Sequence, residues 1–175
     1  RVEGKGTRLL FAPTYNNQTT PTYAQVLLGS HAQTSGSLTI NDGTVEGVPE
    51  YTNGVQITLG SAAGSVGEMT VNGGAVTLGG GNQGLAFVVG KEGRGVYTQT
   101  GGRLTALKPV NVGGTSSADC AGTVNLDGGV FEPVQMLGKY GLSEGGLAVP
   151  TLTADGGRLV PRSAGYGTAS KPFLS

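Results

Sequence analysis

Apolar and polar residues alternate over short runs that end in glycine, and the same arrangement returns at regular intervals along the chain. Its clearest example is residues 124–131 (VNLDGGVF), a pattern typical of a strand, a sharp Gly-Gly corner and a second strand. Four other segments keep the five-residue step from the first inward residue to the corner glycine: 38–45, 69–76, 97–104 and 152–159. The pattern therefore predicts an all-β repeat structure.

Each repeat is expected to have three strands. A short apolar strand ends in glycine (Gly29, Gly60, Gly90, Gly113, Gly138), and a polar loop follows it. The second strand then begins with a glycine, or with Pro150 in the last repeat, and leads through the corner to the third strand. The corner glycines at 43, 74, 102, 129 and 157 are separated by 31, 28, 27 and 28 residues. A nearly constant period of this length indicates a solenoid.

The alternation also predicts which side chains point inward. In the second strands these are Leu38/Ile40, Met69/Val71, Tyr97/Gln99, Val124/Leu126 and Leu152/Ala154, and in the third strands Val45, Val76/Leu78, Leu104/Ala106, Phe131 and Leu159. One coil of this kind cannot bury its apolar face alone, so stacked coils must complete the core.

We therefore expect a parallel β-helix, right-handed, with about five coils of three short strands. An antiparallel sandwich of short strands is the alternative, but a sandwich gives no reason to repeat one strand-corner-strand unit five times. Residues 1–25 are expected to form an N-terminal cap or an incomplete first coil, and residues 26–160 the repeats. Residues 161–175 are expected to begin a further coil or a C-terminal tail.

The units at residues 36–45 (GSLTINDGTV), 122–131 (GTVNLDGGVF) and 151–159 (TLTADGGRL) resemble autotransporter-associated β-strand repeats, which are similar to pectin-lyase-like β-helices. The resemblance covers roughly residues 26–160. It implies a passenger or stalk segment of a secreted or surface-displayed bacterial protein, and hence an extracellular or cell-surface location.

Composition narrows the possible partners. Eleven basic and eleven acidic residues are scattered along the 175-residue chain, so no basic stripe indicates nucleic acid. No run approaches the roughly 20 apolar residues of a membrane helix, and we expect no membrane insertion. The single cysteine, Cys120, excludes an internal disulfide and is interpreted as a small loop residue. The sequence suggests no cofactor.

Asn, Asp or Thr precedes each corner, and stacking would align these residues in a ladder. Asp127 and Asp155 on adjacent coils form a candidate calcium site, since calcium prefers carboxylate and carbonyl oxygens. The simpler interpretation is that such side chains stabilise the tight turns. Two carboxylates are few ligands, and no Asp-rich motif accompanies them.

No catalytic residue is identified, and we expect the chain not to be an enzyme. A glycosidase needs a matched carboxylate pair, and a lyase needs a base. The outward acids Glu46, Glu68 and Glu132 do not form one column through consecutive coils, and His31 lies in a polar loop without a neighbouring Asp or Cys. A polysaccharide lyase or glycosidase remains the alternative.

The most ordered surface feature is an outward column that is the candidate ligand-binding face: Thr39, Thr70, Thr98, Asn125 and Thr153. It could contact carbohydrate or ice, although Thr is also simply a good strand former. The neighbouring column of Ser37, Glu68, Val96, Thr123 and Thr151 is irregular, which argues against ice.

These features predict a structural repeat segment that acts as stalk, scaffold or adhesive module. The alternative is a non-catalytic part of a carbohydrate-active β-helix enzyme. The expected partners are a polysaccharide or a cell-surface molecule. Because no polar repeat covers the apolar residues of the fifth coil, we also expect further coils after Ser175 or another protein chain at that end.

Overall fold

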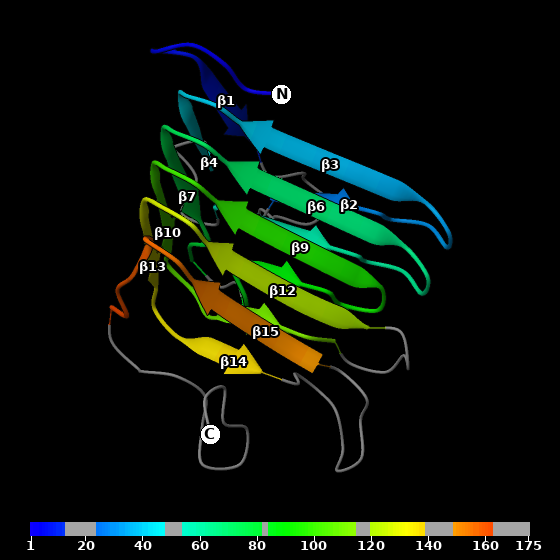
Figure 1. Ribbon diagram of the computed structural model, residues 1–175. Coiled ribbons are helices and arrows are strands. Elements are labelled where there is room, and N and C mark those ends of the chain that lie inside the picture. The colour runs from blue at the N-terminus through cyan, green and yellow to red at the C-terminus, as the bar shows by residue number, and fades with distance from the viewer. Residues whose placement is uncertain (13–23, 48–53, 82–83, 115–119, 139–148, 163–175) are drawn as a thin grey trace.

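The computed structural model describes residues 1–12, 24–47, 54–81, 84–114, 120–138 and 149–162. Every pairing between its strands is parallel, and the strands stack into three ladders (Figure 1). The expected parallel β-helix is therefore confirmed, and the antiparallel sandwich is wrong.

Each sheet collects one kind of strand from successive repeats. Sheet A contains β3 (Ser35–Ile40), β6 (Val66–Val71), β9 (Arg94–Gln99), β12 (Ala121–Leu126) and β15 (Val149–Ala154). Sheet B contains β1 (Arg8–Phe11), β4 (Thr44–Gly47), β7 (Ala75–Leu78), β10 (Arg103–Ala106), β13 (Val130–Pro133) and β16 (Arg158–Leu159). Sheet C contains β2 (Ala24–Leu28), β5 (Val55–Leu59), β8 (Phe87–Val89), β11 (Val110–Val112) and β14 (Met136–Gly138).

The N-terminal segment contributes part of a coil before β2. Val2 forms a parallel bridge to Ile40 at the edge of sheet A, and its side chain is buried. The next strand along the chain, β1, pairs with β4 in sheet B. Residues 13–23, which belong to the expected N-terminal cap or incomplete first coil, lie outside the described residues.

The core follows the predicted alternation. The inward side chains of the three sheets form one hydrophobic cluster. Most of the side chains that the central coils contribute to it are completely buried. Leu38, Leu152 and Leu159 are only half-buried and pack against this cluster. Ala154 is the exception, because it occupies an inward register position opposite Leu126 and is nevertheless exposed.

A polar pair lies in the middle of this apolar core. The Tyr97 hydroxyl donates to Gln99 Oε1 at 2.8 Å, and Gln99 Nε2 donates to the carbonyl oxygens of Gly101, Gly102 and Val130 at 3.1–3.2 Å. Burial raises the pKa of Tyr97 well above its ordinary value. Phe87 and Phe131 pack on the Tyr97 ring, with centroid distances of 5.2 and 5.6 Å. Satisfied hydrogen bonds explain how the inward Gln99 is accommodated.

The corners need glycine for two separate reasons. In four repeats the second corner residue has a positive φ, a conformation that glycine adopts without steric cost: Gly43, Gly74, Gly102 and Gly129. The preceding position is constrained by space, because a Cβ on Gly128 would lie 2.2 Å from the Thr100 carbonyl oxygen of the adjacent coil. Stacking thus excludes side chains even where φ would permit them.

The last corner differs from the other four. Its positive φ belongs to Gly156, at 89°, and not to Gly157. In the preceding corner the Gly128 amide donates a hydrogen bond to Gln99 O of the coil before it. In the last corner the equivalent bond, to Leu126 O, comes from the Gly157 amide. The left-handed residue therefore moves one position earlier in the chain.

Candidate functional site

The outer face of sheet A carries the candidate ligand-binding column. Its five members, Thr39, Thr70, Thr98, Asn125 and Thr153, are consecutive register partners across β3, β6, β9, β12 and β15. The first four are half-buried and Thr153 is exposed. Asn125 Nδ2 lies 3.5 Å from Thr98 Oγ1, so some of the hydrogen-bonding groups of the column are paired with each other across adjacent coils. The structure brings these residues together as the sequence predicts.

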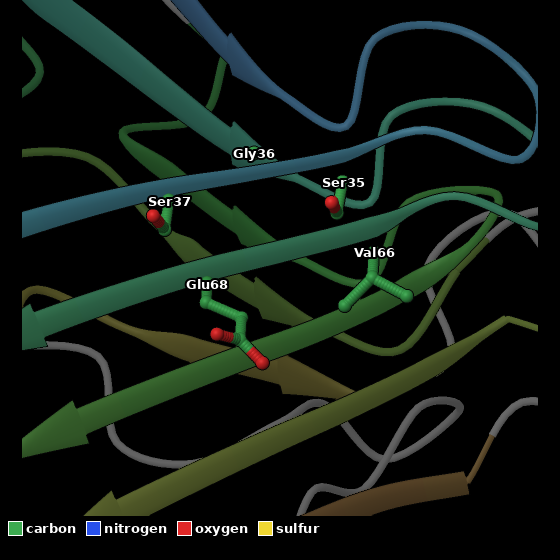
Figure 2. Close-up of a pocket in the computed structure, with 5 residues that line it drawn as sticks. All are labelled: Ser35, Gly36, Ser37, Val66 and Glu68. Atoms are coloured by element: carbon green, nitrogen blue, oxygen red, sulfur yellow. The ribbon is translucent and has the colours of Figure 1, made fainter.

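A hollow of about 350 Å³ lies next to the start of this column, over β3 and β6. Figure 2 shows its lining, with Ser37 and Glu68 on one side and Ser35 and Val66 on the other. The register pairs Ser35 with Val66 and Ser37 with Glu68, so two adjacent coils form the hollow. Glu68 and both serines are exposed.

The chemistry of this region is that of hydrogen bonding. Serine and threonine hydroxyls both donate and accept, and the Glu68 carboxylate accepts. Such groups suit the hydroxyls of a saccharide, and Val66 adds an apolar contact. Among the described residues that line the hollow, Glu68 is the one carboxylate, so they do not assemble the pair that glycoside hydrolysis requires.

The corner column is a hydrogen-bonded ladder over its first coils. Asn41 Nδ2 donates to Glu3 Oε1 at 2.7 Å, and Asn72 Nδ2 donates to Asn41 Oδ1 at 2.8 Å. The Thr100 hydroxyl continues the chain by donating to Asn72 Oδ1 at 2.8 Å. These bonds join successive coils at the corner.

Asp127 and Asp155 continue the corner column, because each backbone amide bonds to the coil before it. Both side chains are exposed, and no group of three or more His, Cys, Asp or Glu residues gathers among the described residues. The structure thus places the two residues of the candidate calcium site at equivalent corner positions of adjacent coils, and gathers no group of three such ligands in the described part of the chain. A coil-stacking role, like that of Asn41 and Asn72, needs no metal ion.

The remaining candidates for acid or base chemistry are spread over the molecule. Glu68 lies on sheet A, whereas Glu46 and Glu132 lie on sheet B, in β4 and β13. His31 is exposed, with its Nδ1 3.0 Å from the Ser30 hydroxyl. These positions assemble no catalytic group within the described residues.

Two Arg-Glu pairs link coils on the outer face of sheet B, with the same diagonal geometry. Arg8 Nη2 lies 2.6 Å from Glu46 Oε1, and Arg103 Nη1 lies 2.5 Å from Glu132 Oε1. In both pairs the glutamate is two residues beyond the register partner of the arginine. Hydrogen bonding by Arg103, supported by Thr105 and by the charge of Arg162, lowers the pKa of Glu132 despite its partial burial.

Replacing Arg103 by Gln should raise the pKa of Glu132 toward its ordinary value. Because the pKa of Glu132 is lowered in the folded state, the ionised carboxylate stabilises the fold at pH values above the ordinary glutamate pKa. This stabilisation is lost as the pH falls from the ordinary glutamate pKa through the folded-state pKa. An exposed pair of this kind contributes about 0.2–1 kcal/mol. An NMR titration of the Glu132 carboxyl measures the change directly. The matched Arg8→Gln variant should leave the titration of Glu132 unaltered, and an equal effect of both variants would contradict the assignment.

Two features of the structure have no counterpart in the sequence-based list of candidates. Outward alternation could have indicated Ser35 and Val66, but the hollow exists only because two coils lie side by side. Asn111, in β11, is completely buried; its Nδ2 donates to Gly113 O, and its Oδ1 has no hydrogen-bond partner among the described residues. A single Asn between two valines gives no signal of this environment.

The fold defines the class of this chain, a parallel β-solenoid with three sheets. Comparison with protein-family models, curated proteins and solved structures gave no match. No helix in the described residues is long and apolar enough to cross a membrane.

Proposed function

We propose that this β-solenoid is a structural repeat segment of a secreted or cell-surface bacterial protein, where it acts as a stalk, scaffold or adhesive module. The resemblance of residues 36–45, 122–131 and 151–159 to autotransporter-associated repeats supports this assignment. The solenoid shape is compatible with it, because stacking coils produces a rod whose length increases with the number of repeats.

The observation that carries the proposal is the use of outer side chains to join coils. Hydrogen bonds or ion pairs cross from one coil to the next on all three sheets or their corners: Gln25–Gln56, Asn41–Asn72, Asn72–Thr100, Thr98–Asn125, Arg8–Glu46 and Arg103–Glu132. These bonds supplement the backbone ladders along the rod axis. A segment that transmits position or force along its length benefits from such connections.

A modular spacer should tolerate the loss of one whole coil. Excising residues 75–102 joins Gly74 to Arg103, the residue in register with Ala75, and removes β7, β8 and β9 together. The shortened chain should still unfold cooperatively. Spin labels at Ser37 and Thr151, in a Cys120→Ala background, are four coil steps apart, and excision should reduce their separation by one step, about 4.8 Å.

The matched control removes residues 76–102, one residue fewer. That junction shifts β10 by one position and turns its inward side chains toward solvent, so cooperative folding should be lost. If both deletions behave alike, or if the first chain fails to fold, the segment is not a modular spacer.

The hollow beside the threonine column favours a second candidate, a non-catalytic part of a carbohydrate-active β-helix enzyme. Ser37 and Glu68 present hydroxyl and carboxylate oxygens next to a row of further hydroxyls. A structure soaked with uronic-acid oligosaccharides distinguishes the two: ordered sugar in this hollow supports the second candidate, and a bare surface supports the scaffold.

A further inference from the structure

The corner between β6 and β7 (Figure 1) contains an asparagine that is directly followed by a glycine, Asn72–Gly73. Asparagine is a chemically labile residue, because the backbone nitrogen that follows it can attack its side-chain amide. Glycine has no Cβ to screen that nitrogen. The chain has one other pair of this kind, Asn53–Gly54, whose asparagine lies outside the described residues.

The Gly73 nitrogen is the attacking group that this corner offers. The glycines at the equivalent place in the next two corners, Gly101 and Gly128, each donate their amide to a carbonyl oxygen of the preceding coil. The Gly73 amide has no acceptor among the described residues. Because Asn72 is exposed and Gly73 is half-buried, water also reaches the corner. The nitrogen is therefore free of the hydrogen bond that holds its counterparts.

The following coil supplies a donor to the carbonyl group under attack. Thr100 Oγ1 donates to Asn72 Oδ1 at 2.8 Å. A donor at this oxygen stabilises the negative charge that develops there when a nucleophile adds to the carbonyl carbon. Asn41, one coil earlier, is followed by Asp42, whose side chain crowds the backbone nitrogen. Asn72 thus combines an unhindered nucleophile with a polarised carbonyl group.

We propose that Asn72 is a site of spontaneous deamidation in the folded chain. The Gly73 nitrogen forms a bond to Asn72 Cγ, the Cγ–Nδ2 bond breaks, and the proton of the attacking amide leaves with Nδ2 as ammonia. Water then opens the cyclic imide at either of its carbonyl carbons, which leaves aspartate or isoaspartate at position 72. Water is the only co-reactant, and no redox change takes place.

The product changes the contacts between the coils of β3 and β6. Asn72 Nδ2 donates to Asn41 Oδ1 at 2.8 Å, and Asn41 Nδ2 in turn donates to Glu3 Oε1 at 2.7 Å. An aspartate at position 72 has no such donor and sets a carboxylate against the Asn41 carbonyl oxygen. The bond from Thr100 needs only an acceptor, so it survives. Deamidation therefore breaks the corner ladder between Asn41 and Asn72.

Packing at the corner also selects between the two products. Isoaspartate adds a methylene group to the main chain, and a Cβ built on Gly73 would already lie 2.5 Å from the Asn41 carbonyl oxygen. The folded chain should therefore give a smaller share of isoaspartate than the chain unfolded in urea, which lacks this contact.

Incubation of the full-length folded chain at mildly alkaline pH tests the proposal, with peptide mass spectrometry following the amide-to-acid mass gain at each asparagine. Asn72 should convert more than about tenfold faster than Asn125, an outward asparagine that is followed by Leu126. Thr100→Val should slow the conversion of Asn72 about two- to tenfold, the effect of losing one hydrogen bond to the developing charge. Thr100→Ser, which keeps the hydroxyl, is the matched control and should convert at the parent rate. Circular dichroism checks that both variants remain folded.

Faster conversion at Asn72 than at Asn125, slowed by Thr100→Val and kept by Thr100→Ser, supports the proposal. Equal rates at Asn72 and Asn125, or conversion of Asn72 only after unfolding in urea, overturn it. Faster conversion in the folded Thr100→Val chain than in the parent overturns the role assigned to Thr100, because its hydrogen bond would then restrain the side chain and not activate it.

Discussion

Replacing Leu126 by Asp is expected to abolish cooperative folding or to lower the free energy of unfolding by several kcal/mol. Leu126 is 1% exposed and lies in the common core, in register between Gln99 and Ala154. An aspartate there would place an unpaired charge among apolar side chains. Since domains are stable by only about 5–15 kcal/mol, such a cost is a large part of the total. Chemical denaturation followed by circular dichroism measures it.

The adjacent residue provides the control. Asn125 points outward and is half-buried, so Asn125→Asp introduces the same charge one position away without entering the core. Its effect should stay within about 0.5 kcal/mol, the usual range for surface substitutions. An unchanged midpoint for Leu126→Asp, or equal effects at the two positions, would refute the strand phase on which the core assignment depends.

The second large effect is expected at the corner glycines, where four Gly→Ala variants separate backbone strain from close approach. Gly129 has a φ of 71°, and a Cβ there would lie 2.6 Å from the backbone of Gly101. Gly128 has only the close approach, and Gly6 only the positive φ, at 84°. Gly84 has neither.

Gly129→Ala and Gly128→Ala should each destabilise by about 2–4 kcal/mol, because a backbone carbonyl of the adjacent coil must move. Gly6→Ala should cost about 1 kcal/mol from its left-handed conformation alone, and Gly84→Ala close to nothing. Thermal and chemical unfolding of the four variants supply the ranking. If Gly128→Ala is as mild as Gly84→Ala, the coils are not stacked as closely as the structure shows.

Much of the fold is predictable from the sequence because the solenoid is a local structure repeated. Alternation assigns Val124 and Leu126 inward and Asn125 outward, and the constant spacing of the corners places equivalent residues in one column. For the same reason the members of the threonine column are register partners across sheet A, and Asp127 and Asp155 occupy equivalent positions before adjacent corners. Their binding roles remain predictions, since a strand-forming Thr and a ligand-binding Thr have the same pattern.

The tertiary structure alone decided what depends on contacts between coils. Gly67 has no unusual φ, but a Cβ there would lie 2.3 Å from the Gly60 amide nitrogen, a constraint that exists only in the folded turn. Gln99 is tolerated in the core because Tyr97 and three carbonyl groups satisfy its amide. The strand pattern of Ala154 matches that of residues that are buried, and its register partner Leu126 is buried, yet Ala154 is exposed. Periodicity in a sequence determines the direction in which a side chain points, whereas its environment is determined by the neighbours that stacking brings to it.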